Sequence, residues 1–399
     1  MSVQLTERAR NISPSPTLTI DTRAKEMLAS GIEVINFGAG EPDFDTPEHI
    51  RESARQAIER GMTRYTAVDG TPALKEAIIN KLERDNGLRY TPGQIVVSVG
   101  AKHSLYNAFQ VLCQPGDEVI LPSPFWVSYL EQIKLAGATV RLVEMRPENE
   151  FKLTPAELSA ALTPRSRILV LNSPSNPTGA VYSRAELEAL VPVVLNAGLT
   201  VISDEIYEYL VYDNHVHVSI AALGPEIKER TVVINGVSKA YAMTGWRIGY
   251  AAAPEPIARA MTGLQGHSTS NPCSVSQAAA VAALNGSQEP TRRMVAEFAV
   301  RRRYMLERLE SIPGVSCPRP GGAFYLFPDM RVFWGRSFSG RKINNATELA
   351  ALLLDEVQVA VVPGIGFGND NHIRLSYATD LETIREGLNR LTTFLNSLE

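Results

Sequence analysis

Lys239 lies four residues after the end of the apolar run 231–235. That run predicts a buried strand of a parallel sheet, and open α/β sheets bind ligands outside the carboxyl ends of their strands. A lysine held there, partly shielded from water, loses its proton easily and can condense with a carbonyl to form a Schiff base. Ser238 and Arg247 flank it with a hydroxyl and a planar guanidinium, which both bind phosphate. The combination suggests pyridoxal phosphate, although an ordinary solvated lysine would look the same in this stretch alone.

A second anion site is predicted where the strand 94–99 is followed by the helix 103–112. Gly100, Ala101 and Lys102 stand between the two. Free backbone N–H groups and the helix dipole both point at a ligand in such a place. The glycine spacing matches neither the Walker A motif nor the dinucleotide fingerprint. The stretch therefore indicates a phosphate or another anion.

Trp126, Asn176 and Asp204 each follow a further predicted strand. A tryptophan there can stack on a planar ring, although tryptophan is also a common core residue. Pro177 fixes an extended turn that can aim the Asn176 amide, and a purely structural turn would look similar. A buried aspartate is costly unless it meets a cation or a donor. A protonated pyridine nitrogen, a core hydrogen bond and a metal are the candidate partners of Asp204.

Arg374 lies among apolar residues in the predicted strand 372–377 and requires an anionic partner if it is buried. A substrate carboxylate and an internal salt bridge both fit. Gly40 follows the short predicted strand 34–37, where glycines let a backbone approach a ligand but also mark ordinary turns. No His, Cys or carboxylate cluster near Asp204 has metal-ligand spacing, so we expect no metal site.

Three other polar stretches are predicted to face solvent. His215 and His217 alternate in a polar loop, and the arginines 301–303 lie on the charged helix 297–310. A basic run on such a helix is more typical of a solvated face than of a nucleic-acid patch. Residues 331–345 are polar with scattered aromatics, which predicts a mobile loop.

The composition is that of a globular enzyme. At 399 residues the chain exceeds one small core, so two domains are predicted. Its 39 basic and 43 acidic residues give a net charge of −4, which favours neither nucleic acid nor an anionic membrane as a partner. No run approaches the roughly 20 apolar residues of a membrane span, and the polar N-terminus is not expected to be a secretory signal. The three scattered cysteines form no disulfide framework, which favours the cytoplasm.

Predicted strands and helices alternate through the middle of the chain, which is typical of an α/β doubly wound, mostly parallel sheet. Residues 1–17 end in alternating prolines and predict an extended arm rather than a helix. Such an arm can lie on a partner subunit. Thr46 is the expected N-cap, and Pro47 the first residue, of the helix 47–60.

Several of these stretches, in order, resemble the aspartate aminotransferase family, fold type I of the pyridoxal phosphate enzymes, and two more resemble its bacterial I-beta subgroup. The resemblance covers nearly the whole chain. It implies a seven-stranded, mostly parallel sheet in a large domain (47–294), a smaller α+β domain from both chain ends (18–46 and 295–399) and an N-terminal arm (1–17). The matching stretches are Asn-Pro-Thr-Gly at 176–179, Asp-Glu-Ile-Tyr at 204–207, Ser-Lys-Ala at 238–240, Gly-Trp-Arg-Ile-Gly at 245–249, Arg-Leu-Ser at 374–376 and, for the subgroup, 39–47 and 125–129.

The resemblance implies roles for the residues around the expected cofactor ring. Lys239 would bind pyridoxal 5′-phosphate and, once released by the substrate, carry a proton between the substrate Cα and the cofactor. Asp204 would pair with the pyridinium nitrogen and keep it protonated, so that the ring accepts electrons. Tyr207 and Asn176 would hydrogen-bond the phenolic oxygen, and Trp126 would stack on the ring. Trp126 and Asn176 would also border the substrate.

The resemblance also implies a shared site in a homodimer. Ser238, Arg247 and the amides of Ala101 and Lys102 would hold the phosphate. Tyr65 resembles the tyrosine that reaches the phosphate of the neighbouring subunit. The partners are then amino-acid and keto-acid substrates and a second copy of the chain, with no nucleic acid and no membrane.

Arg374 would clamp the substrate α-carboxylate in a bidentate fork beside the Gly40 backbone. Lys102 would meet the distal carboxylate, because this chain lacks the partner-subunit arginine that animal-type enzymes use. Thr17 and Ser15 stand where arm residues assist. Together with Lys102, Thr17 resembles the bifunctional aspartate/prephenate aminotransferases. We therefore expect aspartate and 2-oxoglutarate as substrates, with prephenate as a further acceptor.

Other interpretations stay open at this point. A β-lyase, a decarboxylase or an aromatic aminotransferase would share the fold, although Lys102 favours acidic substrates. A pyridoxal-binding regulator would carry an N-terminal DNA-binding domain, for which the arm is short. A hydrolase using Ser238 and Lys239 would place the serine three residues before the lysine, as in S-x-x-K, whereas here they are adjacent.

Overall fold

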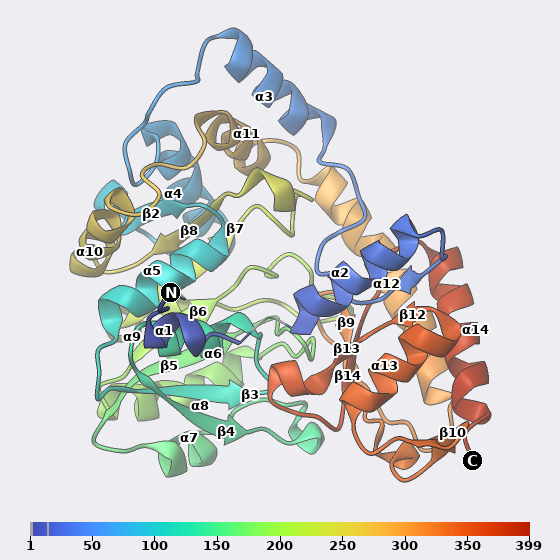
Figure 1. The fold of residues 1–399 in the computed structure, drawn as a ribbon. Coiled ribbons are helices and arrows are strands. Elements are labelled where there is room, and N and C mark those ends of the chain that lie inside the picture. The colour runs from blue at the N-terminus through green and yellow to red at the C-terminus, as the bar shows by residue number, and fades with distance from the viewer. Residues whose placement is uncertain (1–2, 14–15) are drawn as a thin grey trace.

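The computed structural model describes residues 3–13 and 16–399 of the chain. Within those ranges the largest sheet has seven strands, in the order β2-β8-β7-β6-β5-β3-β4 (Figure 1). β8 is antiparallel to β2 and β7, whereas the other neighbouring pairs are parallel. The predicted α/β class with a mostly parallel sheet is confirmed. The strands are β2 (Ile95–Ser98), β3 (Glu118–Ser123), β4 (Thr139–Glu144), β5 (Ser166–Asn172), β6 (Thr200–Asp204), β7 (Thr231–Gly236) and β8 (Gly249–Ala252).

Helices pack on both faces of this sheet, because successive side chains of a buried strand point to opposite sides. Val170 of β5 shares a core cluster with Phe109, whereas its neighbour Leu169 shares another with Leu190. A strand buried on both faces carries a continuous apolar run rather than an alternating pattern, and β5 has such a run at 168–171. The helices are α3 (Glu48–Glu59), α4 (Pro72–Asn86), α5 (Ala101–Leu112), α6 (Ser128–Leu135), α7 (Pro155–Ala161), α8 (Arg184–Asn196), α9 (Pro225–Lys228), α10 (Glu255–Gly266) and α11 (Ser274–Asn285).

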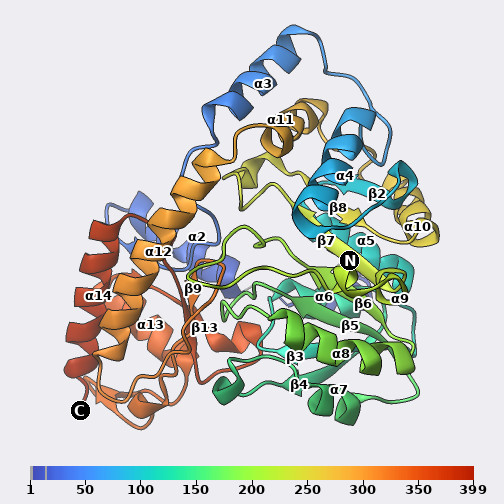
Figure 2. The same cartoon turned by 180° about the vertical axis from the view of Figure 1, so that it is seen from behind.

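Both chain ends build a second group of elements beside the sheet, where blue and red segments meet (Figures 1 and 2). β1 pairs in parallel with β12, and β14 lies between β13 and β9. Ile35 and Phe37 share one core cluster with side chains from the last three helices. The domain boundaries at 46/47 and 294/295 stay predictions. The elements are α2 (Pro16–Ala29), β1 (Ile35–Asn36), α12 (Glu289–Glu310), β9 (Tyr325–Leu326), β10 (Ser337–Phe338), β11 (Arg341–Lys342), α13 (Ala346–Val357), β12 (Val359–Ala360), β13 (Val362–Pro363), β14 (Ile373–Ser376) and α14 (Leu381–Asn396).

The N-terminal segment is not wholly extended, contrary to the prediction for residues 1–17. A short helix, α1 (Glu7–Arg10), forms because the Thr6 hydroxyl caps it by accepting the Ala9 N–H at 3.2 Å. α2 begins at Pro16, which suits the first position of a helix. None of the helices in the described ranges combines the length and the apolar character that crossing a bilayer requires.

Thr46 does not cap α3, so that prediction was wrong. Pro47 stands at the N-cap position and makes no side-chain cap. The Thr46 hydroxyl is engaged elsewhere, because it donates to the Ala242 carbonyl oxygen at 2.6 Å and accepts the Trp246 indole N–H at 3.0 Å. Tertiary contacts with the loop after Lys239 therefore take the place of a local cap.

Of the three arginines predicted on a solvated face of α12, Arg303 is exposed as predicted, whereas the other two are buried. Only 5% of Arg301 and 1% of Arg302 is exposed. Arg301 donates to both carboxylate oxygens of Asp43, at 2.8 and 2.9 Å, and Arg302 donates to Asp213 at 2.6 Å. Their partners come from distant loops, which a local pattern does not reveal. Residues 331–345, predicted as a mobile loop, contain the hairpin β10–β11.

Candidate active site

A cavity of about 350 Å³ lies at the carboxyl ends of the parallel strands. One side is formed by Asn176, Asp204 and Lys239, which follow or end β5, β6 and β7. The other side comes from Gly40, after β1, and from Arg374 of β14. Parallel strands bring their ends to one edge of the sheet, so residues far apart in sequence meet there. The cavity therefore draws on both groups of elements.

Lys239 lines this cavity, and its Nζ donates to the Gly40 carbonyl oxygen at 2.5 Å. Burial lowers the pKa of Lys239 to about 8. The Glu41 carboxylate opposes this shift, and the cations Arg247 and Arg374 add to it. A substantial share of Lys239 is then the neutral amine at mildly alkaline pH. Only the neutral amine attacks a carbonyl.

Asp204 ends β6 and is 4% exposed. Its Oδ2 accepts the Tyr129 hydroxyl at 2.6 Å, and its Oδ1 accepts the Ile206 backbone N–H at 3.3 Å. Burial nevertheless raises the pKa of Asp204 to about 6. A cation in the cavity would therefore find a carboxylate that is poorly hydrated and strongly attractive.

Arg374 is 2% exposed and reaches the cavity from β14. Its Nη1 donates to Asn176 Oδ1 at 3.1 Å and its Nη2 to the Gly38 carbonyl oxygen at 2.8 Å. Its Nε has no partner among the described residues, and none of the described carboxylates forms an ion pair with it. Beside it the Tyr207 and Tyr325 hydroxyls lie 3.0 Å apart. This buried guanidinium is thus available to an incoming carboxylate.

The N-terminus of α5 faces the same cavity and carries the predicted phosphate-binding amides of Ala101 and Lys102. Arg247 lies across it, in the left-handed conformation with φ of 57°. Gly100 has a φ of 83°, a left-handed conformation that favours glycine, and a Cβ there would displace the Arg247 guanidinium. A Cβ on Gly249 would lie 2.1 Å from the Ala101 nitrogen, so glycine also allows the helix to approach β8. A helix N-terminus and a guanidinium at this spacing suit a phosphate.

Lys102 and Trp126 form another part of the wall. Lys102 Nζ lies 5.0 Å from the centroid of the Trp126 ring. Partial burial and the neighbouring Arg247 lower the pKa of Lys102. The Trp126 ring meets Tyr129 edge to face, with centroids 5.3 Å apart, and Ser238 lines the same cavity. A flat aromatic face beside a cation suits a planar ligand that carries a second anionic group.

Two of the predicted site residues that the structure describes, Gly100 and Tyr65, do not line the cavity, and Tyr65 is 91% exposed. Thr17 lies in α2 with a side chain that is not described, and Ser15 lies outside the described residues. The structure also adds Tyr129 and Tyr325, to which the sequence assigned no role. Tyr129 lies in the 125–129 match and so carried a signal, whereas Tyr325 carried none.

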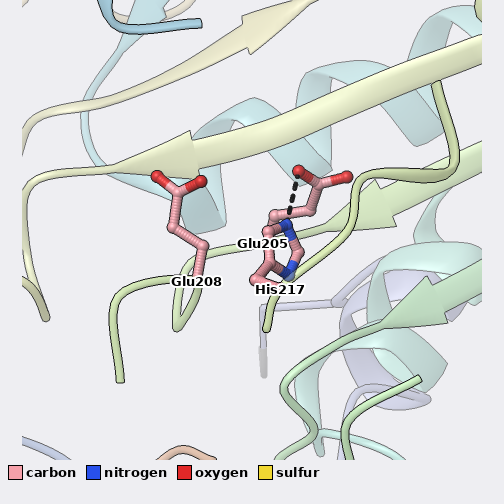
Figure 3. A group of neighbouring side chains, drawn as sticks. All are labelled: Glu205, Glu208 and His217. Carbon is pink, nitrogen blue, oxygen red and sulfur yellow. Dashed lines mark hydrogen bonds and ion pairs between the residues drawn. The ribbon is translucent and has the colours of Figure 1, made fainter. Parts of the chain in front are cut away.

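His217, predicted to be exposed, is buried beside Glu205 outside the cavity. Its side chain is 6% exposed, and its Nε2 lies 3.1 Å from Glu205 Oε2 (Figure 3). The hydroxyls of Ser203 and Ser219 also donate to Glu205, at 2.8 and 2.7 Å. The prediction was wrong because the polar loop folds back against the end of β6. His215, by contrast, is exposed as predicted.

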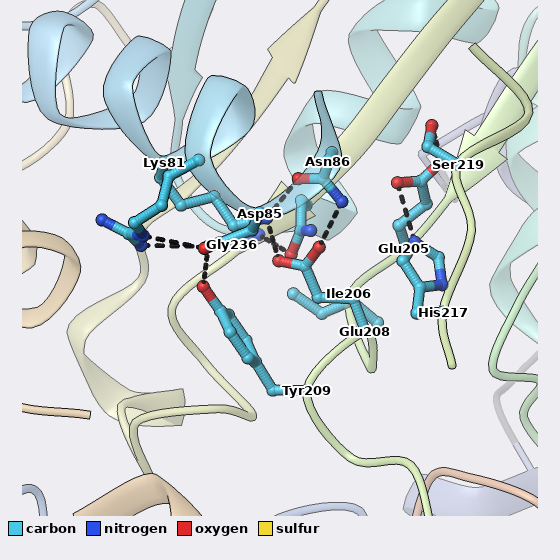
Figure 4. Close-up of polar contacts among 12 residues, drawn as sticks. Lys81, Asp85, Asn86, Glu205, Ile206, Glu208, Tyr209, His217, Ser219 and Gly236 are labelled. Atoms are coloured by element: carbon cyan, nitrogen blue, oxygen red, sulfur yellow. Dashed lines mark hydrogen bonds and ion pairs between the residues drawn. The ribbon is translucent and has the colours of Figure 1, made fainter. Parts of the chain in front are cut away.

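Glu205, Glu208 and His217 offer atoms within 4.8 Å of one another, a grouping that sequence spacing did not reveal. Glu208 is already paired with Lys81, and Asn86 bridges the pair (Figure 4). Lys81 Nζ donates to Asn86 Oδ1 at 2.7 Å, and Asn86 Nδ2 donates to Glu208 Oε2 at 3.0 Å. Because protein donors satisfy both carboxylates, the group is a buried polar network that supports the segment after β6.

Lys81→Met is expected to destabilise the fold strongly. Lys81 is 0% and the Glu208 side chain 5% exposed, so the variant leaves a buried carboxylate without its cation. Removing one partner of such a pair costs about 3–5 kcal/mol in the free energy of unfolding. Denaturant titration measures the loss. The double variant Lys81→Met/Glu208→Leu is the matched control and should recover most of it, and an unchanged curve for the single variant would contradict the expectation.

The profile of the aminotransferase class I and II family matches residues 32–391. The chain therefore belongs to the class I and II aminotransferases, as its resemblance to a branch of that family implied.

Named relatives match over nearly the full length. The aspartate aminotransferase of Geobacillus stearothermophilus is 51% identical over 99% of this chain and 100% of its own. The aspartate/prephenate aminotransferase of Cereibacter sphaeroides is 48% identical over 99% of each chain. The crystal structure of the aspartate aminotransferase from Rhizobium meliloti superposes with a TM-score of 0.96, at 44% identity and with all of both chains covered. That of Thermus thermophilus with maleate gives 0.92 at 41% identity, covering 98% of this chain and 100% of the other.

Proposed function

We propose that this enzyme moves the amino group between L-aspartate and 2-oxoglutarate, forming oxaloacetate and L-glutamate, with pyridoxal 5′-phosphate bound at Lys239. One observation carries the proposal: a single cavity holds an amine of lowered pKa, a buried carboxylate and a buried guanidinium without a carboxylate partner. These groups belong to Lys239, Asp204 and Arg374. The relatives named aspartate aminotransferase support the choice of substrates.

The residues present fit this cofactor. Arg247 and the α5 N-terminus, kept open by the absence of a Cβ at Gly100, would hold the phosphate. Asp204 would face the ring nitrogen, Tyr207 the phenolic oxygen and Trp126 the face of the ring. When bound, the cofactor supplies a sink for the electrons released at the substrate Cα.

The chain's own groups orient the substrate and move its proton. Arg374 would bind the α-carboxylate through its two terminal nitrogens, while Asn176 and Gly38 hold the guanidinium plane. Lys239 Nζ would take the proton from Cα, since its pKa of about 8 lies close to the working pH. Asp204 would remain ionised opposite a cationic ring nitrogen, because an opposite charge favours the charged form.

A homodimer would complete the site. Tyr65 is 91% exposed in the single chain, an unusual position for a large aromatic side chain. We expect its hydroxyl to reach the phosphate in the neighbouring subunit. Each site would then require both copies of the chain.

Prephenate is the second candidate acceptor. Relatives named aspartate/prephenate aminotransferase match this chain at 43–48% identity. Prephenate and 2-oxoglutarate are both dicarboxylates, so one cation, Lys102, could serve either. Maleate, present with the Thermus thermophilus structure, is a dicarboxylate as well.

A panel of amino donors and keto acceptors tests the proposed function. Aspartate and glutamate should react faster than alanine or phenylalanine, with 2-oxoglutarate, oxaloacetate and prephenate as acceptors. Comparable rates with prephenate and 2-oxoglutarate would establish the bifunctional enzyme. Release of pyruvate and ammonia, or a preference for aromatic donors, would contradict the proposal.

Lys102→Met is expected to lower kcat/KM selectively for dicarboxylate substrates. The variant keeps an unbranched side chain over Trp126 but removes the ammonium group. A hydrogen bond to a charged group contributes about 1.5–3 kcal/mol, so kcat/KM for aspartate should fall roughly 10- to 150-fold. The value for alanine should change less than about twofold. An equal loss on both substrates would show that Lys102 serves only the phosphate.

A further inference from the structure

Tyr129 has contacts that the steps above do not use. It lies in α6, three residues after Trp126, and is 1% exposed. Its hydroxyl donates to Asp204 Oδ2 at 2.6 Å. Its ring meets the Trp126 ring at an interplanar angle of 79°. Tyr129 therefore touches both the carboxylate and the aromatic face that would bound the cofactor.

The hydrogen bond from Tyr129 has the length of a charge-assisted bond to a carboxylate, and such bonds are about twice as strong as neutral ones. Burial raises the pKa of Tyr129 well above its usual range, so its hydroxyl remains a donor. Among the described side chains, Tyr129 alone hydrogen-bonds to the Asp204 carboxylate; the other donor to that carboxylate is the Ile206 backbone N–H at 3.3 Å.

Several other charged or titratable groups act on Asp204. The neighbouring Glu205 carboxylate disfavours its ionised form, and Lys239, on the same side of the cavity, favours it. Tyr207 also interacts with Asp204 electrostatically, but its hydroxyl pairs with Tyr325 instead. Tyr129 is thus the contact that most directly offsets the burial of this carboxylate.

We propose that Tyr129 is a positioning residue, which holds the Asp204 carboxylate in one orientation and keeps it anionic for a cationic ring nitrogen. The inference rests on the role proposed above for Asp204. It goes further by assigning the charge state of that carboxylate to a hydroxyl donated from α6. Without this hydroxyl, Asp204 would bind a proton more tightly and rotate more freely.

The first test uses Tyr129→Phe in the full chain without cofactor and measures its unfolding between pH 5 and pH 8. The folded-state pKa of Asp204, about 6, lies above its ordinary value of 3.8. Between these two pKa values the folded state holds more protons than the unfolded state, so stability falls as the pH rises through this window. Loss of the hydroxyl should raise the proton affinity of Asp204 about tenfold, which displaces the upper limit of the window by about one pH unit. The stability deficit of the variant should therefore grow from pH 5 to pH 8.

Two controls separate this role from packing. Tyr250 is also 1% exposed, but its hydroxyl has no partner among the described residues, so Tyr250→Phe should have an effect that does not depend on pH. In an Asp204→Asn background, Tyr129→Phe should lose its pH dependence as well. A deficit that is equal at pH 5 and pH 8, or a variant already unfolded at pH 5, where Asp204 is protonated, would overturn the proposal.

The second test uses the holoenzyme. Tyr129→Phe should lower kcat about tenfold while the KM for aspartate changes less than about twofold, because the Tyr129 hydroxyl donates to Asp204 and not to the groups that would bind the substrate carboxylates. The dissociation constant of pyridoxal phosphate should rise about tenfold. An unchanged kcat and dissociation constant would overturn the proposal. If the unmodified protein shows no transamination but the pH-dependent stability deficit is present, the proposed function is refuted, whereas the effect of Tyr129 on the charge state of Asp204 is supported.

Discussion

Lys239→Ala is expected to abolish transamination, with kcat falling by at least about 10⁴-fold. The variant removes the amine that would bind the cofactor covalently and move the Cα proton. Pyridoxal phosphate should still bind, because Arg247, Asp204 and the α5 N-terminus remain. Steady-state kinetics and absorption in the near-visible range measure the two properties separately.

Covalent labelling makes this prediction specific to one lysine. Borohydride should fix the cofactor to Lys239 in the unmodified protein, as peptide mass spectrometry would show, and to no residue in Lys239→Ala. Lys134→Ala, which alters an exposed lysine paired with Glu131, is the control and should keep full activity. Substantial turnover by Lys239→Ala would refute the covalent role.

The lowered pKa of Lys239 adds an expected pH dependence. Only the neutral amine condenses with an aldehyde, and the neutral fraction rises as the pH passes through about 8. The rate at which the cofactor-free protein captures pyridoxal phosphate should therefore increase between pH 7 and pH 9. An ordinary lysine would show this increase only near its pKa of about 10.4.

Arg374→Ala is expected to weaken the binding of every amino-acid substrate, lowering kcat/KM by about 10²- to 10⁴-fold. Two hydrogen bonds to a carboxylate, each worth about 1.5–3 kcal/mol, account for this range. The loss should be similar for aspartate and alanine, since both carry the α-carboxylate. This pattern distinguishes Arg374 from Lys102, whose replacement should spare alanine.

Arg374→Lys keeps the charge but not the fork, so it should restore only part of the loss. Thermal unfolding of both variants checks that the fold survives, because Arg374 also donates to Asn176 and Gly38. Arg336→Ala is an exposed control that should leave the kinetics unchanged. A loss confined to dicarboxylates would contradict the assignment of Arg374 to the α-carboxylate.

Much of the fold could be predicted because its signals are local. The buried strands of the large sheet are short apolar runs, and the chemistry-bearing residues Trp126, Asp204 and Lys239 follow or end such runs. In a parallel sheet these ends share one edge, so a one-dimensional pattern already implied a common site. The family match then attached a proposed role to each of these side chains.

The errors occurred where a polar residue finds its partner in a distant segment. The sequence predicts Arg302 to lie on the solvated face of α12, yet its buried guanidinium donates to Asp213 and to the Pro320 carbonyl oxygen. His217 reads as part of a solvated loop, yet it lies against Glu205. The sequence predicts Thr46 to cap a helix, yet its hydroxyl donates to the Ala242 carbonyl oxygen in a remote loop.

The sequence by itself determined the order of strands and helices, the glycines Gly100 and Gly249 beside the N-terminus of α5, and the identity of the reactive groups. These features depend on local composition and spacing. Only the tertiary structure decided how much water each group loses and which neighbours it meets. Packing lowers the pKa of Lys239 to about 8, raises that of Asp204 to about 6 and leaves Arg374 without a carboxylate partner among the described residues. Desolvation and Coulomb interactions depend on three-dimensional distances, which sequence separation does not specify.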